Sequence, residues 1–390
     1  MTVWIIEPRD PLVVRDGRPF GPVPGARAVS LAFPFPSTIT GAVRTHDGLD
    51  AAGRFQLSEV HRVKDINARG PLLVELDSGT GDVAHWLVPA PADALLLDLD
   101  PDNTVRLMLK PLVPLQMPPG ARTDLPNALA PVGMPRRDPR KPSNRAPRYW
   151  YWEFFQQWLS DPREREVSLA DLGHDGPVRE ARIHVGIRPE TKTADEERGA
   201  LFQTQGLEFT HALGIQKLSG ARRLGLAVAT DAPNLKSQIA PLGGERRLVF
   251  WRQSRKMLPT LPEEVKENIA DQRHCRLILL TPAHFKAGWK PTWLLREREG
   301  VKPSAQAVAL RRYETVSGWD FDKKQPKATR RLAPAGTVFF LKLEGNSANI
   351  KRWIDTTWMQ CISDEQQDRR DGFGLAVLGV WDGQIHRMEV

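Results

Sequence analysis

Two arginines near the start of the chain flank a turn and could hold an anion. Arg15 and Arg18 enclose Asp16-Gly17, a pair that favours a tight turn. A guanidinium group donates several hydrogen bonds at once, either to a phosphate or to a carboxylate of the same protein. The pattern is therefore compatible with a contact to a polyanion and equally with a loop anchored to a neighbouring acidic residue.

A predicted helix start follows at residues 36–44. Ser37 and Thr38 come just before apolar residues spaced four apart, so either hydroxyl could cap the first free N–H groups. Such an N-terminus favours phosphate, because its N–H groups and the helix dipole act in the same direction. Gly41 lowers the helix propensity, and we expect it to admit a ligand, with a tight helix–sheet contact as an equal alternative.

Two later motifs could also approach a phosphate backbone. Arg222 and Arg223 lead into a predicted strand over residues 224–229. Near the other end, Gly372 and Gly374 open a glycine-rich loop over 372–379 that allows a backbone to come close to peptide N–H groups. The spacing is not G-x-G-x-x-G and a strand follows, so no dinucleotide site is expected. We favour a contact to RNA or to another subunit over simple turn geometry.

The remaining candidate ligands lack the spacing of a metal or hydrolytic centre. No histidine lies in an HExxH or HxH pattern, and Cys275 and Cys361 belong to no CxxC motif. The sequence therefore predicts no metal, no cofactor and no catalytic residue.

Composition limits the possible classes of protein. The chain of 390 residues is long enough for two domains, and 55 Lys and Arg against 47 Asp and Glu give a net charge of +8. This charge favours a polyanionic partner without distinguishing RNA, DNA or an acidic protein surface. Few cysteines, no signal peptide and no long apolar run predict a cytoplasmic protein that does not span a membrane.

Between these motifs the sequence predicts sheets, together with a basic insertion, an aromatic helix and a projecting hairpin. Residues 111–148 are proline-rich and carry seven basic residues against two acidic ones, which suits either a phosphate backbone or a solvated loop. Aromatic residues at 151, 154, 155 and 158 share a predicted helix face and indicate core packing. Residues 182–210 predict a projecting hairpin. Strand, helix, glycine loop and strand then recur in the second half.

Taken in order, the motifs resemble a known family. The blocks RDGRPF at 15–20 and PFPSTITGAVRT at 34–45 are similar to the RAMP subunit at the foot of the type III-B (Cmr) CRISPR effector complex, its third subunit. Further blocks agree with this family in the same order, from residue 4 to about residue 381: 70–71, 86–94, 184–191, 201–202, 206–207, 317–319, 334–337 and 372–375.

The resemblance implies an α+β fold with two ferredoxin-like (RRM-like, βαββαβ) RAMP domains and long insertions, at residues 1–230 and 231–390. It implies a non-catalytic subunit that binds the 5′ handle of the guide RNA (crRNA), with the hairpin acting as a thumb against RNA. Its protein partners would be the adjacent backbone subunit and the large polymerase-like subunit. The residues expected to bind RNA are Arg15, Arg18, Ser37, Thr38, Arg44, Arg222, Arg223, Gly372 and Gly374.

Two alternatives remain open from the sequence. Some RAMP relatives cut CRISPR repeat RNA without metal through a histidine, and His46 at the end of the first predicted helix could take that role. No second base can be paired with it, so a solvated histidine is favoured. The other alternative is a scaffold subunit that contacts only proteins.

Overall fold

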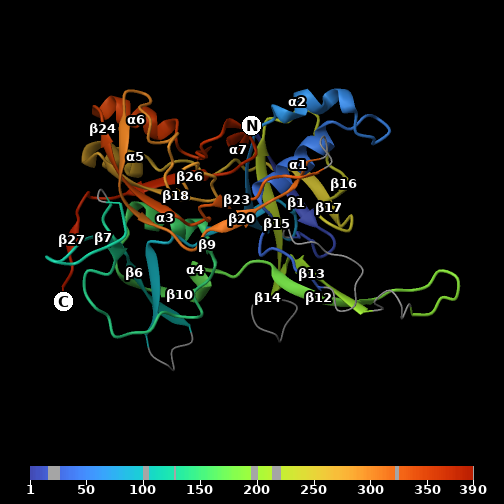
Figure 1. Ribbon diagram of the computed structural model, residues 1–390, viewed down its shortest axis with the longest axis horizontal. Coiled ribbons are helices and arrows are strands. Elements are labelled where there is room, and N and C mark those ends of the chain that lie inside the picture. Colours follow the sequence, from blue (N-terminus) through green and yellow to red (C-terminus); the bar gives the residue numbers. More distant parts are fainter. Residues whose placement is uncertain are drawn as a thin grey trace.

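The computed structural model describes residues 1–15, 27–99, 105–126, 129–194, 201–212, 221–320 and 325–389. Over this part of the chain the fold is mixed α/β, with large sheets and few helices (Figure 1). The predicted mixed class is thus confirmed at this level, and the division into two ferredoxin-like units remains a prediction.

The largest sheet is built around β1 (Thr2–Pro8), β15 (Ala221–Thr230) and β3 (Ala68–Leu76). β15 pairs antiparallel with both β1 and β3. β1 is buried over Val3 to Glu7, as its short β-prone run predicts for a central strand. The sheet continues outward through these strands: β4 (Val83–Pro89), β9 (Tyr149–Tyr151), β11 (Gly173–His174), β14 (Thr210–Ala212), β16 (Ile239–Pro241) and β17 (Leu248–Gln253).

β16 and β17 follow residue 230 in the sequence but pair within this first sheet. The sheet therefore extends to Gln253, beyond the predicted domain boundary at 230, and the boundary itself remains a prediction.

One face of the first sheet is covered by α1 (Pro36–Asp47), followed by η1 (Leu57–Glu59) and α2 (Val60–Lys64). Ile39 and Val43, four residues apart on α1, pack with Trp4, Leu226 and Trp251 of the sheet. This spacing is the one that predicted the helix, and burial of an apolar stripe is what holds it there.

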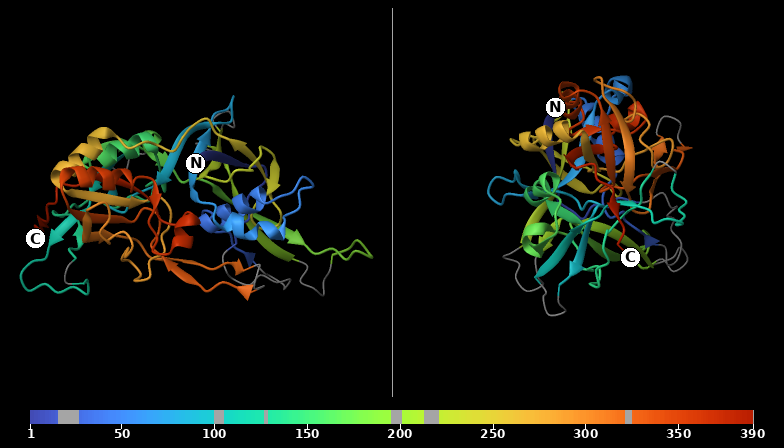
Figure 2. Two further views of the ribbon diagram at one scale, coloured as in Figure 1. Left: turned by 90° about the horizontal axis from the view of Figure 1, so that it is seen from above. Right: turned by 90° about the vertical axis from the view of Figure 1, so that its left-hand side faces the viewer.

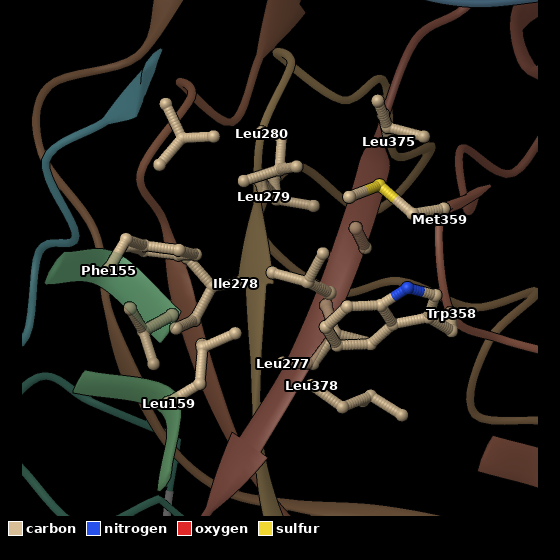
Figure 3. Close-up of a cluster of buried hydrophobic side chains, with 14 of the residues drawn as sticks. Phe155, Leu159, Leu277, Ile278, Leu279, Leu280, Trp358, Met359, Leu375 and Leu378 are labelled. Atoms are coloured by element: carbon tan, nitrogen blue, oxygen red, sulfur yellow. The ribbon is translucent and has the colours of Figure 1, made fainter. Parts of the chain in front are cut away.

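The opposite face belongs to a core shared with the second sheet, whose order is β19 (Lys302–Ala309), β24 (Val338–Glu344), β18 (His274–Leu279), β26 (Leu375–Val380) and β25 (Gln360–Cys361). Phe155 and Leu159 of α3 (Trp152–Ser160) face β18 and β26 in this core (Figure 3). The predicted core role of the aromatic helix is confirmed at Phe155 and Trp158, whereas Tyr151 lies in β9. Two helices complete the unit: α5 (Glu263–Gln272) and α6 (Ser347–Asp355).

Small sheets extend from this body. Strands β12 (Val178–Val185) and β13 (Leu201–Glu208) form an antiparallel hairpin that projects from it, so the predicted hairpin is confirmed (Figures 1 and 2). β2 (Arg27–Ala28) pairs with β13. The other short elements are β5 (Ala94–Asp98), β6 (Arg106–Pro111), β10 (Arg165–Ser168), α4 (Leu169–Leu172), β20 (Glu314–Val316), β21 (Trp319–Asp320), β22 (Gln325–Pro326), β23 (Arg330–Leu332) and α7 (Gln366–Arg370).

The basic proline-rich segment is tied to the rest of the chain. Asp138 binds Arg140 at 2.6 Å and Lys110 at 2.7 Å, and these bonds hold the pKa of Asp138 well below its usual range. Arg145 pairs with Asp98 at 2.8 Å. Strand β7 (Val113–Gln116) pairs with β8 (Val132–Gly133) and with β27 (His386–Arg387) near the chain end. Part of the positive charge of the segment is therefore already compensated within the chain.

Candidate nucleic-acid interface

A cleft of about 720 Å³ opens between the first sheet and segments of the second half of the chain. Its walls come from β3, β4 and β9, from residues 31–36 before and at the start of α1, and from residues 280–282, 311–315 and 334–335. β9 and β20 (Glu314–Val316), which both contribute residues to these walls, lie near the middle of the molecule in Figure 1. Residues far apart in the sequence thus form one concave surface.

The cleft combines positive charge with aromatic rings. Arg148, Arg311 and Arg312 line it, together with Tyr149 and Tyr313. Arg148 lies over the ring of Tyr149 at 5.9 Å, and Tyr313 is 46% exposed. Guanidinium groups can neutralise phosphates, and exposed aromatic faces can stack on bases, so the lining suits a single-stranded nucleic acid.

The start of α1 also reaches the cleft, but with a different cap from the predicted one. Phe35 is the N-cap residue and Pro36 the first helical residue, and no side chain caps the helix. The expectation that Ser37 or Thr38 caps it is therefore wrong, because the fixed φ of proline places the helix start one residue earlier. Phe35 and Pro36 line the cleft, with Ser37 and Thr38 in the following turn.

Arg222 belongs to a polar cluster beside the cleft. It donates to Glu75 at 3.0 Å and to the Tyr151 hydroxyl, while Tyr151 donates to Glu75 at 2.5 Å. His174 Nε2 lies 3.1 Å from the same carboxylate, and its Nδ1 accepts from Gly176 N. Burial raises the pKa of Glu75, but the hydrogen bonds from His174, Tyr151 and Arg222 outweigh it and lower the pKa to about 2.

This cluster and the cleft share one face of the sheet. Tyr151 lies two residues after Tyr149 in β9, and Glu75 two residues after Leu73 in β3. Alternate residues of a strand point to the same side, and Tyr149 and Leu73 line the cleft. Arg222, which is partly exposed, therefore extends the positive surface of the cleft along this face.

Arg223 points to the other face of β15 and joins a separate basic group. It pairs with Glu7 at 3.2 Å, as Arg252 also does. The guanidinium groups of Arg9 and Arg252 lie over the ring of Phe250 at 5.6 and 5.0 Å. The consecutive arginines predicted to act together are thus directed to opposite faces, as strand geometry requires.

The first basic loop is only partly described. Arg15 is exposed, and its backbone forms an isolated antiparallel β-bridge with that of Ser30. Arg18 lies outside the described residues.

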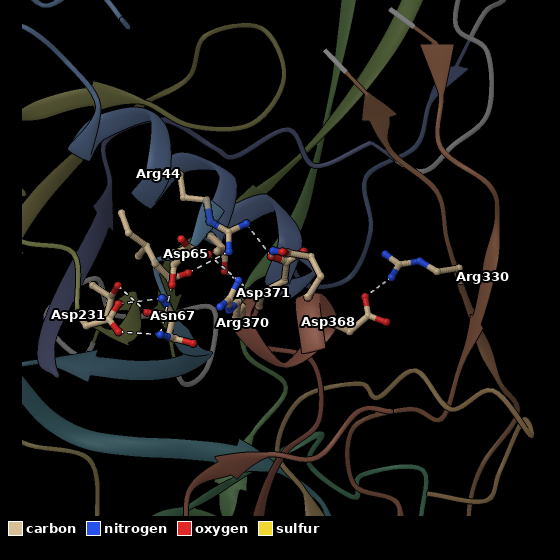
Figure 4. A network of polar contacts seen from close by, with 12 residues as sticks. Arg44, Asp65, Asn67, Asp231, Arg330, Asp368, Arg370 and Asp371 are labelled. Carbon is tan, nitrogen blue, oxygen red and sulfur yellow. Dashed lines mark hydrogen bonds and ion pairs between the residues drawn. The ribbon is translucent and has the colours of Figure 1, made fainter. Parts of the chain in front are cut away.

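Arg44 lies where α1 meets the end of α7, a contact called the seam here (Figure 4), and the glycine loop begins directly after it. Arg44 donates to Asp371 at 2.6 Å and to the Ile66 carbonyl at 2.9 Å, and the Thr40 hydroxyl donates to the Asp371 carbonyl at 2.7 Å. Arg370 pairs with Asp65 at 2.6 Å across the same seam. Arg44 therefore fixes α1 to the end of α7.

Gly372 and Gly374 are buried, with φ of 93° and 84°. A Cβ at Gly372 would lie 2.6 Å from the Gly70 carbonyl oxygen, and one at Gly374 would lie 3.0 Å from Ser363 N. The predicted close backbone approach is present, and within the described residues it is made by this chain. At Gly41 the space around a Cβ is open, so a tight helix–sheet contact there is not what the glycine serves.

His46 is only 6% exposed. Its ring packs edge-on against Trp251 at 5.3 Å, and burial lowers its pKa. The expectation of a solvated histidine is therefore wrong. The histidine occupies the core beneath α1, where it does not face the cleft.

Within the described part of the chain, no three His, Cys, Asp or Glu residues group in a way that could hold a metal ion. Over the same residues, none of the helices has the length and apolar character needed to cross a membrane.

A comparison with known protein families shows to which family the chain belongs. A family model for the CRISPR-associated protein Cas_Cmr3 matches residues 4–381. The chain belongs to the Cas_Cmr3 family. It is therefore a Cmr-type CRISPR-associated protein, and the family relationship predicted from the ordered motifs is confirmed.

Solved structures with similar chains include two of the type III-B Cmr-beta complex. One is bound to cognate target RNA and AMPPnP in state 1: 16% identity, TM-score 0.43, covering 91% of this chain and 88% of the other. The second is bound to cognate target RNA: 16% identity, TM-score 0.44, coverage 87% and 86%. A Csm3–Csm4 subcomplex of the type III-A interference complex matches at 10% identity and TM-score 0.36, with coverage 89% and 94%. No curated protein sequence matches the chain.

The sequence alone did not identify most of the cleft residues of this Cas_Cmr3 chain. Arg148 was counted only as part of the basic segment, and the run Arg311-Arg312-Tyr313-Glu314 was not singled out. Basic residues next to an aromatic one were the available signal, but only the fold brings this run opposite β9.

Proposed function

We propose that this chain binds the 5′ handle of crRNA in the cleft between its two units and has no catalytic role. The observation that carries the proposal is the cleft itself, where three arginines and two tyrosines converge on one concave surface. Within a type III-B effector, the obvious single-stranded ligand for such a surface is the end of the guide that is not paired with target.

Phosphate contacts would position the handle, and stacking would hold its bases. Arg148, Arg311 and Arg312 would neutralise phosphates, while the exposed ring of Tyr313 would stack on a splayed base and Tyr149 would form part of the cleft floor. The start of α1, with Ser37 and Thr38 in its first turn, adds the positive end of a helix dipole.

Other arginines would extend this track. Arg222 continues it along the same sheet face, and Arg15, Arg18 and Arg223 would contact the RNA beyond the cleft. Arg44, Gly372 and Gly374 would act indirectly, because they hold the seam that forms the cleft.

We further propose that the chain has two ferredoxin-like RAMP domains and bridges the adjacent backbone subunit and the large polymerase-like subunit. The projecting hairpin β12–β13 is available for the thumb role that the family implies. The alternative of a repeat-RNA endonuclease using His46 gains no support, because that ring is buried against Trp251 and is not among the residues that line the cleft.

The test is the salt dependence of handle binding. Fluorescence anisotropy with a labelled crRNA would compare the wild type with R311M/R312M and with the control R163M/R352M, which removes two charges outside the cleft. If each cleft arginine contacts one phosphate, the slope of log K against log salt falls by about 1.4 in total, from about 0.7 per phosphate. The control leaves the slope unchanged. Equal slopes in all three proteins would contradict the proposal and favour a subunit that contacts only proteins.

A further inference from the structure

One acidic side chain faces the basic cleft. Glu314 begins β20, lies partly buried in the cleft wall, and is the only carboxylate among the described lining residues. In the described part of the chain its carboxylate makes no hydrogen bond and no ion pair. Arg148 acts on it through its charge, without forming an ion pair.

Such a carboxylate is unfavourable for a cleft that binds only phosphates. It repels each phosphate that enters. Burial raises the pKa of Glu314, although the charge of Arg148 acts in the opposite direction, and no donor among the described residues compensates the loss of water around the carboxylate. Because the carboxylate faces the cleft and has no donor among the described residues, an RNA base in the cleft can supply one. The donor must be an N–H or O–H group.

The tyrosine beside it provides a second unpaired polar group. The Tyr149 hydroxyl makes no hydrogen bond to a described residue, and burial keeps it protonated by raising its pKa. Glu314 in turn contributes to that raised pKa, so the two groups act on the same region of the cleft. The ring of the adjacent Tyr313 is 46% exposed, and the Arg331 guanidinium lies over it at 5.0 Å, which leaves the opposite face for a base.

We propose that Glu314 reads a guanine of the bound RNA through its Watson–Crick edge. Two carboxylate oxygens match two neighbouring donors, and guanine presents N1–H and N2–H side by side. Adenine and cytosine each place a ring-nitrogen acceptor beside the amine, and uracil flanks its single N–H with two carbonyls. Each of these would oppose one of the carboxylate oxygens. This inference rests on the proposed function, because it requires RNA in the cleft.

The test uses short RNAs with a single variable base. The probes are an eight-nucleotide oligouridine and variants with one guanine, adenine or cytosine at each position in turn. Their affinities would be measured at fixed salt for the wild type, E314Q and the control E344Q, which changes an exposed glutamate outside the cleft.

At one position guanine is expected to bind about tenfold more tightly than the other three bases. E314Q should abolish this preference, because an amide replaces one acceptor by a donor, while E344Q should retain it. If the wild type binds the probes without preferring guanine, or E314Q keeps the preference, the inference is overturned and the proposed function stands. If the wild type binds none of the probes, the proposed function itself fails. A lower melting temperature of E314Q with unchanged base preference would make Glu314 a structural counter-charge to Arg148.

Discussion

Replacing Arg276 by methionine should strongly destabilise the contact between the first half of the chain and the second sheet. Arg276 on β18 and Asp93, between β4 and β5, are each 2% exposed, and their side chains pair at 2.7 Å. Arg276 also donates to the carbonyls of Val380 at 2.9 Å and Trp158 at 2.5 Å. R276M leaves a buried carboxylate without its counter-charge, which costs about 3–5 kcal/mol.

The assay is urea unfolding followed by tryptophan fluorescence, with R163M as the control. Arg163 and Asp161 form an exposed pair, so R163M should cost about 0–1 kcal/mol. The double variant D93N/R276M should recover part of the loss, because it removes the uncompensated charge. Equal stability of R276M and R163M would show that the buried pair contributes no more than an exposed one. A double variant less stable than R276M would show that lost contacts dominate over the buried charge.

Three further outcomes follow from the seam and the polar cluster. R44M should lower the free energy of unfolding by about 2–4 kcal/mol, because Arg44 pairs with Asp371 in the half-buried seam. It should leave the salt dependence of handle binding unchanged, and a changed slope would show that Arg44 contacts RNA. G372A should lower the free energy of unfolding by about 1–3 kcal/mol, because Gly372 has a positive φ and a Cβ there would meet the Gly70 carbonyl. The control G41A, which adds a methyl group into open space in α1, should raise it by about 1 kcal/mol. Equal effects of the two substitutions in urea unfolding would contradict this prediction. The pKa of Glu75 is lowered to about 2 in the folded protein, so the ionised carboxylate stabilises the fold at pH values above its ordinary pKa near 4.5. The difference in melting temperature between wild type and E75Q should therefore stay constant from pH 8 to 5 and shrink as the pH falls toward 2. A difference that is unchanged down to pH 2 would contradict this prediction.

The elements that sequence reasoning predicted well are those fixed by local periodicity. Apolar residues four apart predicted α1, and the aromatic run predicted a core helix at α3. The hairpin was visible as alternating strands around a polar turn. In each case neighbouring residues carry the information, because an apolar stripe or an alternating pattern selects one period.

The site could not be predicted because its partners are remote in sequence. Arg44 is a basic residue of the kind that often binds RNA. Only the fold shows that Asp371, 327 positions away in the sequence, lies beside it. Gly372 was recognised as a place of close approach, but whether RNA or Gly70 approaches it depends on how the two sheets pack. Arg311 to Glu314 carry no periodic signal and gain meaning only opposite β9.

The most direct test of the cleft is a nucleotide-resolved photocrosslink in the assembled effector. Reconstituted type III-B complex would be loaded with crRNA carrying 4-thiouridine in the handle and irradiated, and the crosslinked peptides would be identified by mass spectrometry. If the handle lies in the cleft, it should crosslink to peptides containing Tyr313 or Tyr149, and these crosslinks should be lost in R311M/R312M but not in R163M/R352M. Handle crosslinks confined to other subunits, or to surfaces of this chain outside the cleft, would contradict it.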